Sequence, residues 1–351
     1  MPEGLLSGEA AWAAVKAGRA LPLAGGPLAF TQIELIQRDA RKRAAAGFAA
    51  PDFERSLRRQ PAAMRRRLEA LLDRLTARRP RFAGLAMDRP RIMGIINVTP
   101  DSFSDGGQFL DAGRAIEHGR RLVEAGAGIL DIGGESTRPG AEPVSAAEEI
   151  RRVVPVIQGL HKSGAVISID TRHSSVMAAA VEAGASIIND VTALTGDPES
   201  LGVAARSRAG VVLMHMQGEP RTMQANPRYR EAALDLYDYF AAQIETAETA
   251  GLPRRRIAID PGIGFGKSVA HNQDILHRLA LLQGLGCPVL LGVSRKSFIA
   301  KLSRGEDASH RLAGSLAAAL WGLRTGAQMI RVHDVAETAQ AVAVWQALAS
   351  P

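Results

Sequence analysis

Polar side chains occur at or just after the ends of eight short apolar runs between residues 91 and 334. Their types are those that bind ligands or do chemistry, and they comprise Asn97, Asp131, Asp170, Asn189, Asp190, His215, Asp260, Ser294, Arg295, Lys296, Ser297, Arg331, His333 and Asp334. One polar residue at a strand end is ordinary, because Asx residues begin turns and cap helices. A complete set at eight ends exceeds what turns and caps require, and it predicts a ring of functional groups.

Three residues of this set offer hydrogen-bond acceptors to a ligand. Asp170, Asn189 and Asp260 suit a flat heterocycle with an amidine-like or guanidine-like edge. The reason is that a carboxylate binds two adjacent N–H groups strongly and directionally. The alternative, in which the polar residues only cap helices and form turns, explains single positions better than it explains the set.

Other residues of the set favour an anion. Arg331 and His333 are two positions apart in an extended run, so their side chains share one face. Together with Asn97, Thr137 and Arg138 they could hold a phosphate or a diphosphate, whose shape matches the arginine fork.

Lys296 is notable because lysine is scarce in this chain. Only 6 of the 43 basic residues are lysines, and Lys296 follows an apolar run and precedes a predicted helix. We interpret it as a ligand-binding residue, the alternative being a solvated lysine on a loop. Ser297 would lie at the start of that helix, where backbone amides and the helix dipole favour a carboxylate.

The glycine-rich segment PGIGFGKS (residues 261–268) resembles a phosphate-binding P-loop but departs from it. The pattern G-x-x-x-x-G-K-S/T requires glycine where this chain has Pro261. We interpret the segment as a place where the backbone approaches a ligand closely beside Asp260, which glycine permits. His118, His215 and His271 have no partners at metal-ligand spacing, and we interpret them as structural.

Alternating strands and helices must position the ring. A helical stretch follows each of the eight runs, which read RIMGIINV, GILDIG, AVISID, ASIIND, GVVLMHM, RIAIDP, PVLLGV and QMIRVH. One helix begins with the capping-box pattern Ser145-x-x-Glu148. Strands that alternate with helices run parallel and are covered on both faces. We therefore predict an α/β fold, a (β/α)8 TIM barrel over residues 89–351 with its site at the C-terminal strand ends. An open doubly wound sheet is the alternative.

Residues 1–88 are predicted to form an additional helical, arginine-rich N-terminal extension. Thr31-x-x-Glu34 has capping-box spacing, and Pro61 suits the first turn of a helix. That helix carries an apolar stripe, which predicts packing against the rest of the protein: Met64, Leu68, Leu71, Leu72 and Leu75. The segment contains no pattern of residues that indicates chemistry, and its role stays open.

Composition limits the class of protein and its partners. The chain has 351 residues, 46% hydrophobic and 23% charged, as is typical of a globular protein with a sizeable core. The net charge of +7 originates in residues 41–81, where 13 basic residues oppose 4 acidic ones. We interpret this as a solvated helix face and expect neither a nucleic-acid nor a membrane partner. A single cysteine, Cys287, no signal peptide and no apolar run long enough to span a bilayer predict a cytoplasmic protein.

Eight segments resemble, in this order, those of the dihydropteroate synthases, which are pterin-binding enzymes: NVTPDSFSDGG, DIGGESTRPGA, SIDT, IIND, LMHMQGEPRTMQ, DPGIGFGK, GVSRKSF and RVHDV. The resemblance covers residues 91–349 and does not include residues 1–88. It implies a reaction in which para-aminobenzoate displaces diphosphate from 6-hydroxymethyl-7,8-dihydropterin diphosphate. The product would be 7,8-dihydropteroate, for folate biosynthesis. It also implies a homodimer and Mg²⁺ as cofactor.

The resemblance also implies roles for individual residues. The pterin would be bound by Asp170, Asn189, Asp260 and Lys296, with Phe265 and Met214 lining the pocket. Mg²⁺ would be ligated by Asn97. The diphosphate would be held by Thr137, Arg331 and His333. The para-aminobenzoate site would be shaped by Phe103, Pro139 and Ser297. A mobile first loop that closes over the substrate would contribute Asp101 and Asp105.

The residue inventory agrees with this chemistry. An aromatic amine is unprotonated at neutral pH, so the reaction needs no strong base, whereas expelling diphosphate needs cations such as Mg²⁺ and Arg331. We expect a dissociative substitution in which Asp170 and Asp260 stabilise positive charge on the pterin. The predicted catalytic set is Asp101, Asp105, Asp170, Lys296, Arg331 and His333. Two alternatives remain, a methyltetrahydrofolate-dependent methyltransferase without a diphosphate site and a non-catalytic pterin-binding paralogue.

Overall fold

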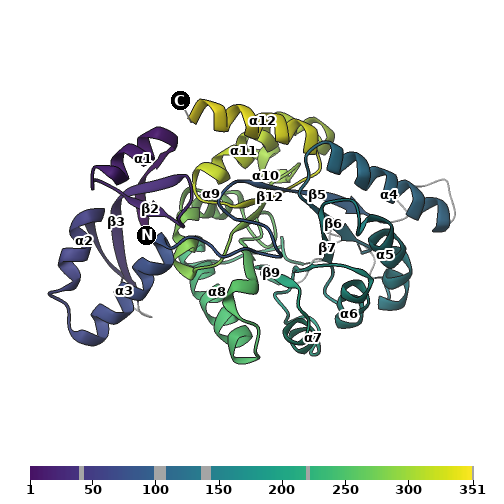
Figure 1. The fold of residues 1–351 in the computed structure, drawn as a ribbon, viewed down its shortest axis with the longest axis horizontal. Helices are drawn as coiled ribbons and strands as arrows, with labels where there is room; N and C mark the ends of the chain where they lie inside the picture. Colours follow the sequence, from purple (N-terminus) through teal and green to yellow (C-terminus); the bar gives the residue numbers. More distant parts are fainter. Residues whose placement is uncertain (39–42, 99–107, 136–143, 219–221, 350–351) are drawn as a thin grey trace.

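Eight parallel strands form a barrel in the computed structural model of the chain (Figure 1), which describes residues 1–349 except 39–42, 99–107, 136–143 and 219–221. The strands are β5 (Arg91–Asn97), β6 (Ile129–Gly133), β7 (Val166–Asp170), β8 (Ile187–Asp190), β9 (Gly210–Met214), β10 (Ile257–Asp260), β11 (Leu290–Gly292) and β12 (Met329–Val332). Their order is β10-β9-β8-β7-β6-β5-β12-β11. A parallel bridge between Ile259 and Val289 joins the two ends. The barrel prediction is confirmed, and the open-sheet alternative is wrong.

Helices surround the barrel and cover the outer faces of its strands (Figure 1). The α-helices are α4 (Gln108–Glu124), α5 (Ala146–Leu160), α6 (Ser174–Ala183), α7 (Ser200–Arg206), α8 (Ala232–Thr249), α9 (Val269–His277), α10 (Ser297–Leu302), α11 (Leu312–Arg324) and α12 (Val335–Ala349). Short 3-10 helices are η2 (Arg254–Arg256), η3 (Leu279–Leu285) and η4 (Ala308–His310). The predicted cap of α5 is present, since Ser145 Oγ accepts the Glu148 N–H at 3.3 Å. No helix in the described part of the chain is both long and apolar enough to span a membrane.

The interior of the barrel is divided into an apolar and a polar level. Residues two apart along a strand point to the same side. Near the N-terminal strand ends the inward residues are buried and apolar: Met93, Ile129, Ile187, Val212, Ala258, Leu290 and Met329. Phe82 is fully buried among them and closes that end of the barrel. Two positions further toward the C-terminal ends, four of these strands carry polar residues of the predicted ring: Asp131, Asn189, Asp260 and Arg331.

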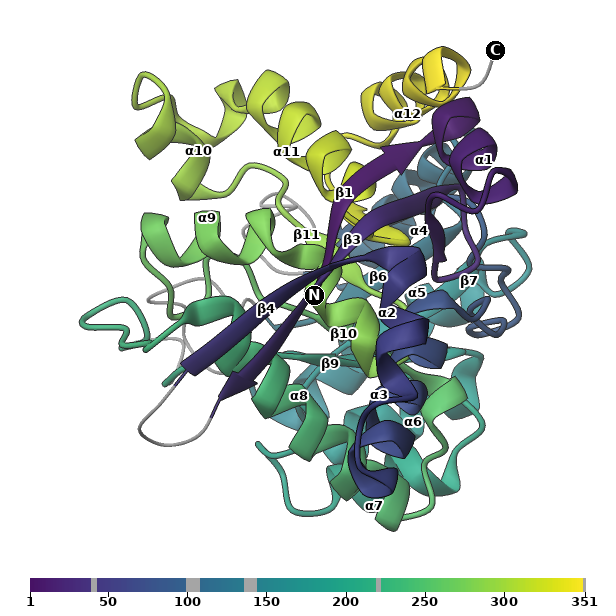
Figure 2. The same ribbon diagram turned by 90° about the vertical axis from the view of Figure 1, so that its left-hand side faces the viewer.

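The N-terminal segment contains an antiparallel sheet as well as helices (Figure 2), so the prediction of a wholly helical extension is wrong. Its elements are β1 (Pro2–Ser7), α1 (Gly8–Lys16), β2 (Leu21–Leu23), β3 (Leu28–Arg38), β4 (Arg43–Ala49), α2 (Ala50–Leu57) and α3 (Ala62–Thr76). The residues Thr31 to Glu34, predicted as a helix cap, lie inside β3. This strand pairs with β1 on one side and with β2 and β4 on the other. Strand pairing and the β-branched and aromatic residues of the segment therefore override a local capping pattern.

The apolar stripe of α3 behaves as predicted for the most part. Leu68, Leu72 and Leu75 are buried, and they pack with the extension's own sheet and with Ala280 of η3 on the barrel. Met64, at the start of the stripe, is exposed.

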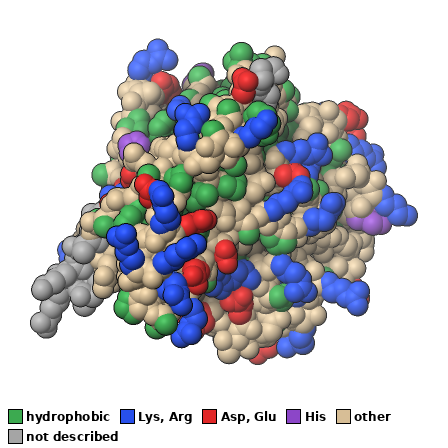
Figure 3. All heavy atoms as spheres, turned by 60° about the vertical axis from the view of Figure 1, so that its left-hand side comes forward, with side chains coloured by type: hydrophobic (Ala, Val, Ile, Leu, Met, Phe, Trp, Pro, Cys, Tyr) green, Lys and Arg blue, Asp and Glu red, His purple; other side chains and the backbone are tan. Residues whose placement is uncertain are grey.

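On the outer face of the extension the basic side chains are interspersed with acidic ones (Figure 3).

A buried arginine joins the extension to the barrel. Arg79 is 5% exposed and donates hydrogen bonds to the carbonyl oxygens of Arg74 (2.7 Å), Ala77 (3.1 Å) and Gln283 (2.7 Å). A fourth bond reaches Gln283 Oε1 at 2.9 Å. Burial lowers the pKa of Arg79 to about 10, so the group stays charged at neutral pH.

We expect Arg79→Met to lower the free energy of unfolding by about 2–4 kcal/mol, because it leaves several buried carbonyl oxygens without donors. Denaturant unfolding measures this. The neighbouring Arg78→Met is the matched control, since Arg78 is 69% exposed and makes only a surface pair with Asp88. Its loss should cost less than about 1 kcal/mol. Equal effects of the two substitutions would contradict the anchoring role of Arg79.

Candidate active site

The polar level at the C-terminal strand ends brings together predicted site residues from six strands. Strand register places Asn97 beside Gly133, Gly133 beside Asp170, and Asp170 beside Asn189. Asp260 of β10 pairs with Met214 of β9, the strand that follows β8 around the barrel. The inward set is completed by Asp131 and Arg331, which follow the apolar inward residues Ile129 and Met329 by two positions. The predicted ring therefore exists, and it consists of the residues whose positions along the strands point them into the barrel.

Arg331 makes the strongest contacts within the site. Its Nε donates to Asp131 Oδ2 and its Nη2 to Asp170 Oδ2, both at 2.6 Å. Burial lowers the pKa of Arg331, but attraction to Asp131 and Asp170 outweighs that effect and holds the pKa above its ordinary value. The guanidinium predicted to hold a diphosphate is thus already engaged with two carboxylates of the barrel.

Asp131 is a site residue whose role sequence reasoning missed. It is fully buried, and its Oδ2 also accepts the Asn189 side-chain N–H at 3.1 Å. Because the Asn189 amide nitrogen faces Asp131, its oxygen is the atom left for a ligand. The signal that could have found Asp131 is its parity, two residues after the inward Ile129.

Asp190, the polar residue directly after Asn189, does not belong to the inward set. Its carboxylate accepts the N–H groups of Thr192 (2.7 Å) and Leu194 (2.9 Å), as well as the Thr192 hydroxyl (2.7 Å). Asp190 therefore holds the turn after β8, as the alternative interpretation of caps and turns expects.

Asp260, Lys296 and Phe265 converge on one corner of the site. A Cβ atom built on Gly292 would lie 3.7 Å from Lys296 Nζ and 3.8 Å from Asp260 Oδ2, so both groups approach the same point above β11. Lys296 Nζ also donates to the Ile263 carbonyl and lies 4.8 Å from the centre of the Phe265 ring. Burial lowers the pKa of Lys296 to about 8, with Asp260 opposing the shift. Burial raises the pKa of Asp260, and the charge of Lys296 opposes this rise.

The electrostatic balance of the site favours a ligand with N–H donors. Asp131, Asp170 and Asp260 carry three negative charges when ionised, against two positive charges on Arg331 and Lys296, which leaves −1. Burial also raises the pKa of Asp170, while Arg331 lowers it. A neutral ring with several N–H groups can satisfy these carboxylates without adding a buried charge.

An unusual backbone conformation accompanies Lys296. The preceding residue, Arg295, has φ of 59°, a left-handed value that is uncommon outside glycine. Its side chain pairs with Asp334, and its N–H donates to Ser315 Oγ at 2.8 Å. These contacts fix the turn that directs Lys296 inward. Ser297 is the first residue of α10, and His333 Nδ1 lies 3.0 Å from Ser294 Oγ.

The glycine-rich segment after β10 packs against the protein's own backbone. Gly262 and Gly266 have φ of 63° and 58°, and a Cβ there would lie 2.0 Å from the His215 carbonyl oxygen and 2.4 Å from that of Gln217. We predicted that the backbone here approaches a ligand closely. At these two glycines it instead approaches the protein's own segment after β9. Asp260 accepts the Gly262 N–H at 2.7 Å, which aligns one of its oxygens.

Lys267 holds this segment together and was not found by sequence reasoning. Its Nζ is buried and donates to the carbonyl oxygens of His215 (3.1 Å), Gly262 (3.0 Å) and Phe265 (3.0 Å). It also lies 3.0 Å from His215 Nδ1. Burial lowers the pKa of His215 to about 3 and that of Lys267 to about 7. His215 is therefore neutral and structural, as predicted, and His271 caps α9.

We expect the stability contributed by Lys267 to depend on pH. Between pH 7 and 10.5 the unfolded chain binds a proton at this lysine that the folded chain does not, so stability rises with pH in that window. The stability of the wild type relative to Lys267→Met should grow by up to about 1.4 kcal/mol per pH unit. Urea unfolding at pH 7 and pH 9 measures this, with the exposed Lys301→Met as control. Parallel pH profiles for all three proteins would contradict it.

Six predicted site residues lie outside the described residues. They are Asp101, Phe103, Asp105, Thr137, Arg138 and Pro139. Their assignments, and the prediction of a closing first loop, stay predictions.

A parallel barrel with polar side chains at its C-terminal strand ends is the arrangement of the (β/α)8 barrel enzymes. The sequence profile of the pterin binding enzyme family matches residues 93–333. Dihydropteroate synthase of Escherichia coli K12 is 45% identical over 267 residues, which is 76% of this chain and 94% of that protein. The chain belongs to the dihydropteroate synthase family.

Solved structures agree with this assignment. A Xanthomonas albilineans dihydropteroate synthase with 4-aminobenzoic acid is 50% identical, with a TM-score of 0.72, over 77% of this chain and 98% of that one. A structure from the same organism in complex with 7,8-dihydropteroate is 47% identical, with a TM-score of 0.68, over 75% and 95%. About a quarter of this chain thus lies outside each match.

Proposed function

We propose that this chain condenses 6-hydroxymethyl-7,8-dihydropterin diphosphate with para-aminobenzoate, giving 7,8-dihydropteroate and diphosphate in folate biosynthesis. The observation that carries the proposal is the convergence of Asp260 and Lys296 on one point at the mouth of the barrel, on the same polar level as Asn189. This convergence occurs in a chain 45–50% identical to dihydropteroate synthases. Relatives of solved structure hold 4-aminobenzoic acid and 7,8-dihydropteroate.

In this proposal the carboxylates recognise the pterin. Asp260 accepts from two adjacent N–H groups of the ring, because such a pairing is strong and directional. Asn189 accepts through its side-chain oxygen, since its nitrogen is engaged by Asp131. Asp170 and Asp260 stabilise the positive charge that develops on the pterin as the bond to diphosphate breaks. The arylamine then attacks the exposed carbon and loses its proton to solvent, so no base is required.

The diphosphate would be held by cations at the same mouth. Arg331 and His333 are two positions apart at the end of β12. The Arg331 guanidinium would bind the leaving group while it also donates hydrogen bonds to Asp131 and Asp170. The oxygen donors of this site suit Mg²⁺, because Mg²⁺ favours oxygen ligands and binds through few protein groups plus substrate phosphates. Asn97, at the end of β5, would supply one amide oxygen. When bound, Mg²⁺ would neutralise charge on the departing diphosphate.

Release of diphosphate tests the proposed reaction. The full chain with Mg²⁺, the pterin diphosphate and para-aminobenzoate should release one diphosphate per dihydropteroate formed. A methyltetrahydrofolate-dependent methyltransferase would release none, and a pterin-binding paralogue would bind the pterin without turnover. Absence of both products from a folded protein would overturn the proposal.

Two further properties belong to the same proposal, a homodimeric state and a cytoplasmic location. The dimer is supported by apolar side chains on the outer helices, with Trp321 42% exposed, Val344 55% and Leu348 84%. Trp321 lies on α11 and the other two residues on α12, which contacts α11, and exposed apolar surface of this kind can mark an interface. Light scattering on a sizing column should give twice the mass of the chain, and a monomer at micromolar concentration would refute the dimer.

A further inference from the structure

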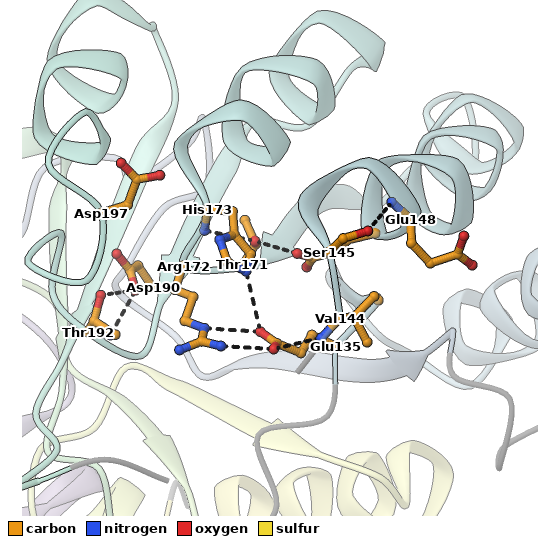
Figure 4. Close-up of polar contacts among 12 residues, drawn as sticks. Glu135, Val144, Ser145, Glu148, Thr171, Arg172, His173, Asp190, Thr192 and Asp197 are labelled. Atoms are coloured by element: carbon orange, nitrogen blue, oxygen red, sulfur yellow. Dashed lines mark hydrogen bonds and ion pairs between the residues drawn. The ribbon is translucent and has the colours of Figure 1, made fainter. Parts of the chain in front are cut away.

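A second cluster of ionisable side chains lies at the ends of β6 and β7 (Figure 4). Glu135 follows β6 by two residues, Arg172 and His173 follow β7, and Glu149 lies in the first turn of α5. None of these residues has a place in the reaction proposed above. The question is what their unused ligand atoms bind.

Glu135 is held firmly but keeps one acceptor position open. Its Oε1 accepts Arg172 Nη2 at 2.9 Å and the Val144 N–H at 3.3 Å, and its Oε2 accepts Arg172 Nε at 3.1 Å (Figure 4). A carboxylate has about four lone-pair positions, so these three bonds, the ones made among the described residues, leave one free. That position belongs to Oε2, which lies 3.8 Å from His173 Nε2.

The other two side chains carry buried atoms without partners. Glu149 is fully buried, and its Oε2 accepts the Thr171 hydroxyl at 3.1 Å, while its Oε1 accepts no hydrogen bond from the residues that the structure describes. His173 Nε2 is also buried and has no hydrogen-bond partner in the described part of the chain. Buried polar atoms are rarely left unsatisfied, because each costs about 1–3 kcal/mol. Two such atoms in one cluster indicate a ligand.

The three side chains converge. One ligand atom from each of Glu135, Glu149 and His173 lies within 4.8 Å of the other two. Two carboxylate oxygens and one imidazole nitrogen are a ligand set for zinc and related divalent ions, whereas magnesium favours oxygen alone. We propose that Glu135, Glu149 and His173 bind one divalent transition-metal ion of the zinc type, independently of the reaction site.

Charge supports a cation at this position. With both glutamates ionised, Arg172 alone leaves the cluster at −1, and a divalent ion brings it to +1. Burial raises the pKa of Glu149 to about 8, and repulsion from Glu135 adds to the rise while Arg172 opposes it. A bound divalent ion would displace this proton, because a metal-ligating carboxylate must be deprotonated. Arg172 occupies the far side of the Glu135 carboxylate, so the ion and the guanidinium use different lone pairs. Water would complete the coordination, as in zinc sites with three protein ligands.

The ion would tie together three elements. Its ligands come from the end of β6, the end of β7 and the start of α5, and Glu135 also binds the N–H of Val144. We therefore expect a structural effect, a higher unfolding temperature, and no requirement for this ion in turnover.

Metal titration of the chelator-treated full chain tests the site. Calorimetry should find one Zn²⁺ per chain, and Co²⁺ should give the visible absorption of an ion with fewer than six ligands. Glu149→Gln keeps an acceptor for Thr171, and His173→Gln keeps a polar side chain, so both variants should fold. Each should weaken binding by more than the roughly 10–100-fold that changes outside the ligand set cause.

Glu148→Gln is the matched control, because Glu148 is the adjacent acid on α5 and pairs with Arg151 and Arg152 instead. It should bind Co²⁺ and Zn²⁺ as the wild type does. Failure of the wild type to bind either ion at one equivalent would overturn the proposal and assign the open positions to a buried water molecule. Binding that survives both ligand substitutions would also overturn it.

Discussion

Replacing Asp260 by asparagine should abolish most of the affinity for the pterin substrate. Asp260 is 5% exposed, one of its oxygens is fixed by the Gly262 N–H, and the other faces the point approached by Lys296. The amide has about the same shape, but it has no charge and presents an N–H where the ligand would also present one. Losing this charged pairing should cost about 3–4 kcal/mol, which is about 10²–10³-fold in the dissociation constant.

Calorimetry with the pterin diphosphate and Mg²⁺ measures this loss. Asp307→Asn is the control, since Asp307 is exposed and caps no helix through its side chain. Thermal unfolding of both variants establishes that each is folded. Wild-type affinity in Asp260→Asn would show that the pterin is recognised elsewhere in the barrel.

Replacing Arg331 by methionine should be the most destabilising change in the site. It removes the only cation within hydrogen-bonding distance of Asp131 in the described residues and leaves Asp131 and Asp170 as buried neighbouring carboxylates. Breaking one side of a buried ion pair typically costs about 3–5 kcal/mol. Turnover should be lost as well, because the carboxylate geometry depends on this arginine.

The pH dependence of the Arg331→Met defect provides a second measurement. Burial already raises the pKa of Asp170, and Arg331 is the group that opposes this shift. Without the arginine the folded pKa rises further above the unfolded value, so the folded state binds a proton that the unfolded state releases. In the wild type the pKa of Asp170 is already about 7, so the defect should change little below that pH and grow above it.

Asp131→Asn in the Arg331→Met background should restore part of the stability, because it removes one of the two unpaired charges. The exposed Arg304→Met is the surface control. A pH-independent loss, or a double variant no more stable than the single one, would show that Arg331 acts by packing rather than by charge.

Much of the barrel and of its site could be predicted from the sequence. Each strand is short and apolar with a polar residue at its end, and helices separate the strands, which leaves few arrangements other than a closed parallel barrel. Parity along a strand then assigns Asp170, Asn189 and Asp260 to the interior, because the side-chain period of a strand is two. Asp190, one position later, points away and holds a turn.

Contacts between distant residues could not be predicted in this way. Arg331 and Asp131 are 200 residues apart in the chain, and Lys267 reaches His215 across 52 residues. No local pattern states which carboxylate an arginine will meet, or that a glycine-rich segment will close on a neighbouring loop. The cluster of Glu135, Glu149 and His173 likewise forms only when β6, β7 and α5 are in place.

The two parts of the chain differ in what their sequences determine. In residues 91–349 the local pattern alone determined the order of strands and helices and the level at which polar groups meet, because a barrel repeats one unit under one geometric rule. In residues 1–80 only the tertiary structure decided the outcome. Thr31 to Glu34 carries a helix-capping pattern worth about 1 kcal/mol, yet it lies in β3, where pairing on both sides and burial of Phe30 and Ile33 are worth more.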